Sequence, residues 1–127
     1  MTGYLDLEDL LAAADAAVGQ RIPVRDIGLL QAAVARPQAT AFGEDAYPTL
    51  DDKAAALLHS LVSGHPLADG NKRLGWVALR LFYLLNGENL HPDPQDAFDL
   101  IVAIANGNLD EVPMIAARLR AWRAERG

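Results

Sequence analysis

One short segment, residues 65–73 with the sequence HPLADGNKR, holds the residue types best suited to chemistry. Its histidine, His65, carries an imidazole, a group that can accept a proton from a hydroxyl group. Asp69 supplies a carboxylate further along, and Lys72 and Arg73 add positive charge. A base, a carboxylate and two cations in one segment predict a site that transfers a phosphoryl or nucleotidyl group.

The same segment stands at the start of a predicted helix over residues 71–86, where an anion can bind. The first backbone N–H groups of a helix lack partners within it, and the helix dipole adds positive potential. Gly70 lets the backbone approach an anion closely, and Lys72 and Arg73 lie where a polyphosphate would be. Mg²⁺ that accompanies a nucleotide is commonly held by one or two carboxylates and phosphate oxygens, which suits Asp69.

Ordinary interpretations of these residues compete with the chemical one. Asp69-Gly70 by itself is a common turn, and a Lys-Arg pair is often only solvated. His59, inside an apolar helix, is expected to be structural, and His91 is expected to lie on the surface. A zinc site formed by all three histidines is conceivable, but their spacing fits no established ligand pattern.

A phosphate-binding loop of the Walker A type is excluded. That motif has four residues between its first glycine and Gly-Lys, which is followed by Ser or Thr. Here five residues separate Gly64 from Gly70, another residue intervenes before the lysine, and Arg73 occupies the hydroxyl position. A helix rather than a strand is also predicted before the loop.

Hydrophobic residues recur at helical spacing along most of the chain, and strand signals are almost absent. Capping residues, glycines and prolines delimit six predicted helices, over residues 6–18, 27–36, 50–64, 71–86, 94–105 and from 110 onward. The stretch 38–48 breaks this periodicity and predicts a loop or a short hairpin. We therefore predict an all-α fold, with one domain over residues 1–127 forming a compact bundle of about six helices.

The predicted helix over residues 71–86 differs from the others because it is apolar on nearly every side between Leu74 and Leu85. Such a helix is normally surrounded by its neighbours, so we expect it to be the buried centre of the bundle. Its exposed end must then be its start, where the polar residues of the segment 65–73 are concentrated.

Length, charge and composition narrow the classes of function. The chain has 127 residues and a net charge of −6, so it is a poor candidate for binding nucleic acid, whose affinity comes from clustered Lys and Arg. The longest wholly apolar run, Leu81 to Leu85, is far shorter than the roughly 20 residues that a membrane span needs. No secretory signal is recognisable, and the absence of cysteine fits a reducing compartment. We expect a cytoplasmic protein.

The segment 65–73 resembles the motif of the Fic/Doc family, whose general form is His-Pro-Phe, two variable residues, Gly-Asn, Gly or Lys, and Arg. Its second half is similar to the Doc branch, the "death on curing" toxins of toxin–antitoxin modules, in which lysine stands where AMP-transferring Fic proteins usually have glycine. The stretches 28–38, 42–48 and 57–64 also look Doc-like, so the resemblance covers most of the chain.

The resemblance implies a small Fic-type helical bundle that modifies proteins with ATP and Mg²⁺. His65 would be the base that activates a target hydroxyl, and Asp69 would hold Mg²⁺. The anion hole would be formed by Gly70, Asn71, Lys72 and Arg73. In Doc proteins the nucleotide lies inverted relative to Fic enzymes, so the γ-phosphate is transferred. The implied target is a threonine of elongation factor Tu, and the implied partner is a Phd-like antitoxin whose C-terminal segment blocks a groove of the toxin.

Two positions depart from the family pattern. Leu67 replaces the usual phenylalanine, so an apolar anchor for the loop survives. Trp76 stands where AMP-transferring members have a second arginine, and Arg80 is expected to lie too deep to replace that arginine. The open alternatives are protein adenylylation, which transfers AMP, and a catalytically inactive Fic-like module that only binds a partner.

The stretch around Phe42, Gly43 and Tyr47 corresponds by position to the flap that docks the target peptide in this family. Its irregular sequence is consistent with an exposed edge that can pair with an extended peptide. The alternative interpretation is an ordinary surface turn.

Overall fold

The computed structural model describes residues 1–21 and 23–124, and within these ranges the chain forms six α-helices, one 3₁₀ helix and one two-stranded sheet. In chain order the elements are α1 (Leu7–Val18), α2 (Ile27–Ala35), η1 (Arg36–Gln38), β1 (Thr40–Ala41), β2 (Glu44–Asp45), α3 (Leu50–Gly64), α4 (Asn71–Leu85), α5 (Pro94–Ala105) and α6 (Val112–Ala124). The predicted all-α fold is confirmed, as is the short hairpin.

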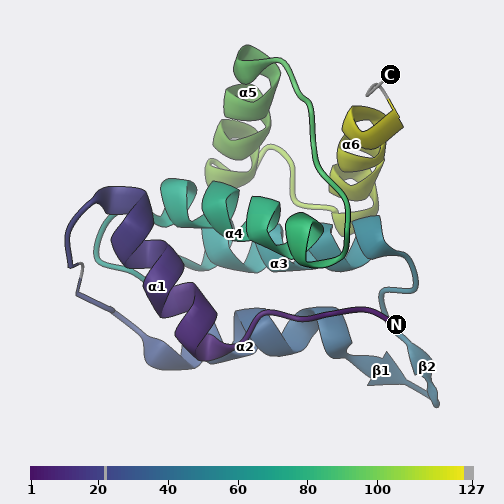
Figure 1. Ribbon diagram of the computed structural model, residues 1–127, viewed down its shortest axis with the longest axis horizontal. Coiled ribbons are helices and arrows are strands. Elements are labelled where there is room, and N and C mark those ends of the chain that lie inside the picture. Colours follow the sequence, from purple (N-terminus) through teal and green to yellow (C-terminus); the bar gives the residue numbers. More distant parts are fainter. Residues whose placement is uncertain (22, 125–127) are drawn as a thin grey trace.

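Helices α3 and α4 run side by side through the middle of the molecule (Figure 1). Helices α1 and α2 lie on one side of this central pair, and α5 and α6 lie on the other. The segment 65–73 therefore lies between the two central helices: residues 65–70 form the loop that joins them, and residues 71–73 are the first turn of α4.

Side-chain caps explain where most of the helices begin. The Asp6 side chain accepts a hydrogen bond from the Asp9 backbone N–H, and the Asp6 backbone N–H donates to the Asp9 carboxylate, which is a capping box at the start of α1. Thr49 and Asp52 form the same arrangement at the start of α3. Asp26 caps α2 with its side chain. These local interactions are readable from the sequence, and the predicted starts of these helices are correct.

Helix α3 is more completely enclosed than α4. Most of α3 is buried between Asp51 and Val62, whereas α4 exposes three leucines of its C-terminal half: Leu81, Leu84 and Leu85. The prediction that the helix after the motif is surrounded on nearly every side is therefore wrong for this outer face. No helix within the described residues is long and apolar enough to cross a membrane.

Helix α6 begins at Val112, two residues after the predicted start at Asp110. The Asp110 carboxylate instead accepts a hydrogen bond from His59 Nε2 of α3 at 2.7 Å. The predicted apolar face is confirmed, since its three members are all buried: Ile115, Leu119 and Trp122. Arg126, one of four arginines expected near the end of this helix, lies outside the described residues.

A buried polar cluster joins α3, α4 and α6. The carboxylate of Asp51, which is only 1% exposed, accepts a hydrogen bond from the Tyr83 hydroxyl at 2.6 Å. It also accepts bonds from Arg123 Nε at 3.0 Å and Arg123 Nη2 at 2.7 Å. Burial, followed by the hydrogen bond to Asp51, raises the pKa of Tyr83 above its ordinary value.

We expect this raised pKa to weaken the fold at alkaline pH. The folded protein keeps the Tyr83 phenol protonated, whereas the unfolded chain releases that proton above the ordinary pKa of 10.0. The stability from this group is therefore complete below about pH 10 and declines as the pH rises further. Urea unfolding of the wild type and of Tyr83→Phe at pH 8 and pH 11 checks this. The variant should lose less stability between the two pH values than the wild type, and an equal loss contradicts the expectation.

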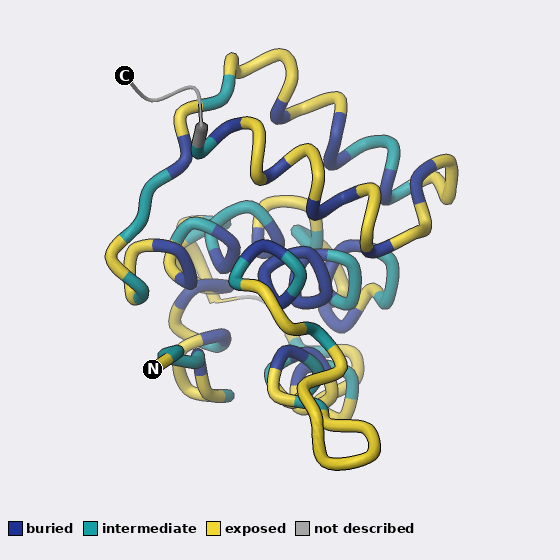
Figure 2. The backbone as a smooth tube through the Cα atoms, turned by 90° about the vertical axis from the view of Figure 1, so that its right-hand side faces the viewer, coloured by how far each residue is buried: buried dark blue, intermediate teal, exposed yellow. Residues whose placement is uncertain are grey.

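The hairpin of β1 and β2 projects from the helical body and is exposed (Figure 2). Its strands pair antiparallel, with Thr40 opposite Asp45. Phe42 and Gly43 at the tip both have positive φ, at 54° and 79°, which is the conformation of a tight hairpin turn. The buried ammonium of Lys53 on α3 ties the hairpin down through an ion pair with Asp45 at 3.1 Å.

Candidate active site

The candidate site begins at His65, where α3 ends and the chain turns toward α4. His65 is exposed and has left-handed backbone angles, φ 53° and ψ 56°. A residue that is neither glycine nor asparagine in this region costs of order 1–3 kcal/mol and persists only where its surroundings impose it. This left-handed turn ends α3, and the His65 side chain is exposed rather than buried in the core.

The start of α4 is the second component, and it is left open. Its N-cap residue is Gly70, with φ 87°, and no side chain caps the helix. By contrast, side chains cap α1, α2, α3 and α5. The first backbone N–H groups of α4, together with the exposed side chains of Lys72 and Arg73, are therefore available to an anion.

Asn71 holds the loop in shape with its side chain. Its Oδ1 accepts a hydrogen bond from the backbone N–H of Leu67 at 2.9 Å, and its Nδ2 donates to the Leu67 carbonyl at 3.1 Å. Leu67 itself is 1% exposed, so the predicted apolar anchor exists. The side chain of Asn71 is thus engaged within the loop, and its contribution to an anion site would come from its backbone.

Asp69 lies on the exposed part of the loop, next to Gly70. Its Oδ1 accepts a hydrogen bond from the Gly70 backbone N–H at 2.8 Å, and its second oxygen has no such partner among the described residues. Those residues contain no group of three or more His, Asp or Glu side chains able to hold a metal ion. One free carboxylate oxygen fits Mg²⁺ that arrives with a nucleotide, because such Mg²⁺ takes most of its ligands from phosphate and water.

We expect Gly70→Ala to distort this loop. A Cβ at Gly70 would lie 2.7 Å from Val18 Cγ2, at a backbone angle that side chains disfavour. Gly107→Ala is the matched control, since Gly107 has φ +82° but nothing within 4 Å of its Cβ position. Both variants should lose about 1 kcal/mol from backbone strain, and Gly70→Ala should lose about 1–3 kcal/mol more from overpacking. Equal losses in urea unfolding would mean that Val18 moves aside freely.

A groove of about 1020 Å³ adjoins the start of α4 and runs between α4 and α5. Lys72, Arg73 and Arg80 give it positive charge, and its other lining includes Trp76 and Phe98. Arg80 therefore faces this groove. The expectation that Arg80 lies deep in the core is wrong. His65 and Asp69 are not part of the lining, so the imidazole and the carboxylate lie outside the groove.

The groove was not apparent from the sequence. Its lining comes from α1, α4, α5 and the loop before α5, and only the spacing of Lys72, Trp76 and Arg80 on one helix face hints at it. His91, which lines the groove from that loop, is exposed as predicted.

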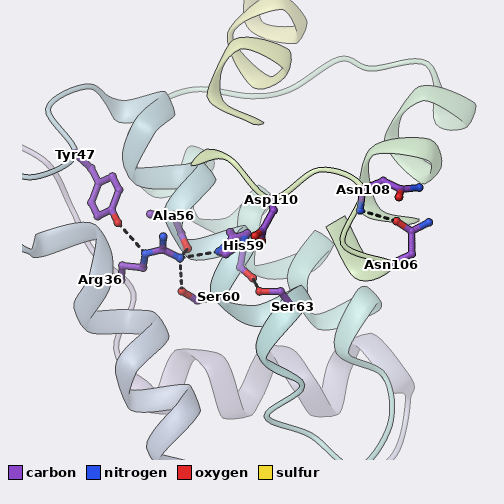
Figure 3. A network of polar contacts seen from close by, with 9 residues as sticks. All are labelled: Arg36, Tyr47, Ala56, His59, Ser60, Ser63, Asn106, Asn108 and Asp110. Carbon is purple, nitrogen blue, oxygen red and sulfur yellow. Dashed lines mark hydrogen bonds and ion pairs between the residues drawn. The ribbon is translucent and has the colours of Figure 1, made fainter. Parts of the chain in front are cut away.

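His59 lies in a separate polar network between α3, η1 and the start of α6 (Figure 3). Arg36 Nη1 lies 2.9 Å from His59 Nδ1, and a guanidinium can only donate. Nδ1 is therefore the acceptor, so Nε2 carries the proton and donates to Asp110 Oδ1 at 2.7 Å. Both ring nitrogens are engaged, which agrees with the structural role predicted for this histidine.

The hairpin residues proposed for docking differ in position. Phe42 is fully exposed at the tip next to Gly43. Tyr47 is only partly exposed, and its hydroxyl accepts a hydrogen bond from Arg36 Nε at 2.9 Å. Tyr47 therefore anchors the base of the hairpin, and Phe42 is the side chain that a partner would meet.

Comparison with known proteins shows the family to which the chain belongs. Residues 4–83 match the Fic/DOC family, and this range contains the whole segment 65–73. The chain belongs to this family. A curated relative is Toxin Doc of Mycolicibacterium smegmatis (strain ATCC 700084 / mc(2)155), which is 52% identical over 126 residues. The aligned region covers 98% of this chain and 96% of that protein.

Proposed function

We propose that this protein is a Doc-type toxin of a toxin–antitoxin module. In this proposal it transfers the γ-phosphoryl group of ATP to a hydroxyl side chain of a target protein. The observation that carries the proposal is the uncapped start of α4. Lys72 and Arg73 are exposed in its first turn, and His65 is exposed on the loop that leads into it. Similarity to a relative named Toxin Doc over nearly the whole chain supports the toxin assignment.

The proposed reaction assigns one task to each side chain. The target hydroxyl oxygen attacks the γ-phosphorus, the bond to ADP breaks, and His65 accepts the hydroxyl proton. The backbone N–H groups at the start of α4 and the cations of Lys72 and Arg73 stabilise the charge on the transferring group. Asp69 would hold Mg²⁺, which when bound neutralises charge on the phosphate oxygens.

Two residues favour phosphoryl transfer over AMP transfer. Lys72 is bulky where AMP-transferring members usually have glycine. Trp76, at the position of their second arginine, packs edge-on against Trp122 with ring centroids 6.4 Å apart. Neither residue supplies the second guanidinium that those members use, so the usual AMP-transferring orientation of the nucleotide is disfavoured.

The groove between α4 and α5 is the proposed binding site of an antitoxin. Cations at its end near Lys72 and apolar side chains such as Trp76 and Phe98 suit an amphipathic, acidic segment of a Phd-like protein. A segment bound there would cover Lys72 and Arg73 and block the anion site. By family resemblance we propose a threonine of elongation factor Tu as the target, and therefore a cytoplasmic location. The net charge of −6 disfavours direct contact with nucleic acid.

The position of the label decides between the two transfer reactions. The protein is incubated with Mg²⁺, elongation factor Tu and ATP labelled at either the α- or the γ-phosphate. Label from the γ-position alone should appear on the target. Transfer of the α-label would replace the assignment with adenylylation, which is the second candidate function.

A growth experiment separates an enzyme from an inactive binding module. Induction of the chain alone should arrest the host, and co-expression of the antitoxin from the adjacent reading frame should restore growth. The Lys72→Ala/Arg73→Ala double variant should lose toxicity, because the anion site then lacks both side-chain cations. Arrest by this variant equal to that of the wild type would rule out the phosphate chemistry.

A further inference from the structure

Arg25, in the loop before α2, lies outside the segment 65–73 but contacts the strained backbone of His65. Arg25 Nε donates to the His65 carbonyl oxygen at 2.8 Å, and Arg25 Nη2 donates to the same oxygen at 2.6 Å. Nη2 also donates to the Gly64 carbonyl at 3.2 Å. One guanidinium therefore binds two carbonyl groups of the residues where α3 ends.

These carbonyl groups belong to the end of a helix, where they lack partners within the helix. A cation is favourable there because the helix dipole is negative at its C-terminus. The planar fork of a guanidinium can bind both oxygens at once, whereas the ammonium of a lysine is a single point charge. Arg25 thus meets both the hydrogen-bonding and the charge requirements of the turn at His65.

Arg25 is itself fixed to the loop that it supports. The backbone N–H groups of Arg25 and Asp26 donate to the Pro66 carbonyl at 2.8 and 3.0 Å, and Ala68 N–H donates to the Pro23 carbonyl at 3.1 Å. These bonds flank an antiparallel bridge between Val24 and Leu67. The segment 23–26 therefore forms a short strap along the residues that follow His65.

We propose that Arg25 is a positioning residue for His65, holding its left-handed backbone so that the imidazole stays where the target hydroxyl must be. This inference rests on the proposed function for its catalytic consequence, but not for its geometry. Arg25 acts through the backbone of His65, and its hydrogen bonds are to carbonyl oxygens, so it is not assigned to the phosphates.

The first test follows the His65 backbone directly. Labelling with ¹⁵N-histidine gives one backbone amide signal for each of the three histidines, and the His65 signal is the one missing in His65→Asn. In Arg25→Ala the His65 signal should shift or broaden, whereas those of His59 and His91 should stay in place. Arg25→Lys, which keeps a charge near the carbonyls, should give an intermediate shift.

The control is Arg21→Ala, which removes an exposed arginine from the same loop and should leave all three signals unchanged. Because Arg25 is exposed and fills no cavity, the melting temperature of Arg25→Ala should stay within about 3 °C of the wild type. A melting temperature that falls while the His65 signal stays in place would overturn the proposal, since Arg25 would then only stabilise the fold.

The second test measures turnover. Misplacement of a catalytic group by about 1 Å can cost about 10²-fold in rate, so kcat of Arg25→Ala should fall by up to about 10²-fold with KM for ATP nearly unchanged. Arg25→Lys should recover part of the loss. A fall in kcat with an unmoved His65 signal would overturn the proposal, because Arg25 would then act on substrate directly. If the wild type transfers no phosphoryl group, the proposed function fails, and the amide signal still decides the role of Arg25.

Discussion

His65→Asn should abolish phosphoryl transfer while leaving the protein folded. Loss of a general base typically costs about 10²–10⁴-fold in rate. Asparagine cannot act as that base, yet it tolerates the left-handed backbone found at His65, φ 53° and ψ 56°. The melting temperature should therefore equal or slightly exceed that of the wild type, although the single-turnover rate with labelled ATP falls to near background.

A second substitution at this position separates the side chain from the backbone. His65→Gly removes the imidazole and also the steric strain, so it should be as inactive as His65→Asn and at least as stable. Turnover within about tenfold of the wild type in either variant would mean that another group accepts the proton. The base would then have to be sought elsewhere on the loop.

Asp51→Ala should have the largest effect on stability. It would leave the buried Tyr83 hydroxyl without its 2.6 Å acceptor, and of the two carboxylates paired with Arg123 only Glu88, at 3.3 Å, would remain. Breaking a buried ion pair typically costs 3–5 kcal/mol. We expect about 3 kcal/mol, at the lower end of this range, because Arg123 reaches solvent. Urea unfolding at neutral pH measures the change directly.

Two further variants give this experiment its controls. Asp15→Ala removes an exposed carboxylate from the interior of α1 and should change the stability by less than about 0.5 kcal/mol. Asp51→Asn keeps an acceptor for Tyr83 but loses the charge that faces Arg123, so its loss should be intermediate. A loss below about 1 kcal/mol for Asp51→Ala would contradict the view that this cluster holds α3, α4 and α6 together.

Local sequence signals accounted for much of the secondary structure. Asp6 and Thr49 begin helices because their side chains satisfy backbone N–H groups only three residues away. The predicted start of α6 at Asp110 was two residues too early, and the Asp110 side chain is hydrogen-bonded to a distant residue, His59. A local signal is reliable only where no tertiary contact competes for the same side chain.

The apolar pattern of α4 predicted the burial of this helix less well than the capping residues predicted where helices begin. It indicates that much of the helix is buried, but it does not say which neighbours cover each face. Leu81, Leu84 and Leu85 are exposed because the packing of α1, α3 and α5 leaves that side of α4 open. Burial depends on the arrangement of other helices, and a periodicity within one helix carries no information about that arrangement.

The sequence by itself determined the chemical content of the site. His65 and Asp69 lie on the loop before α4, and Lys72 and Arg73 lie in its first turn, so their nearness follows from covalent connection. The start of the helix follows from local backbone preferences. Only the tertiary structure decided what supports and surrounds that loop. The Arg25 contacts and the groove between α4 and α5 join residues far apart in the chain. Such contacts form only when helices pack, since their free energy comes from burial and hydrogen bonding between separate elements.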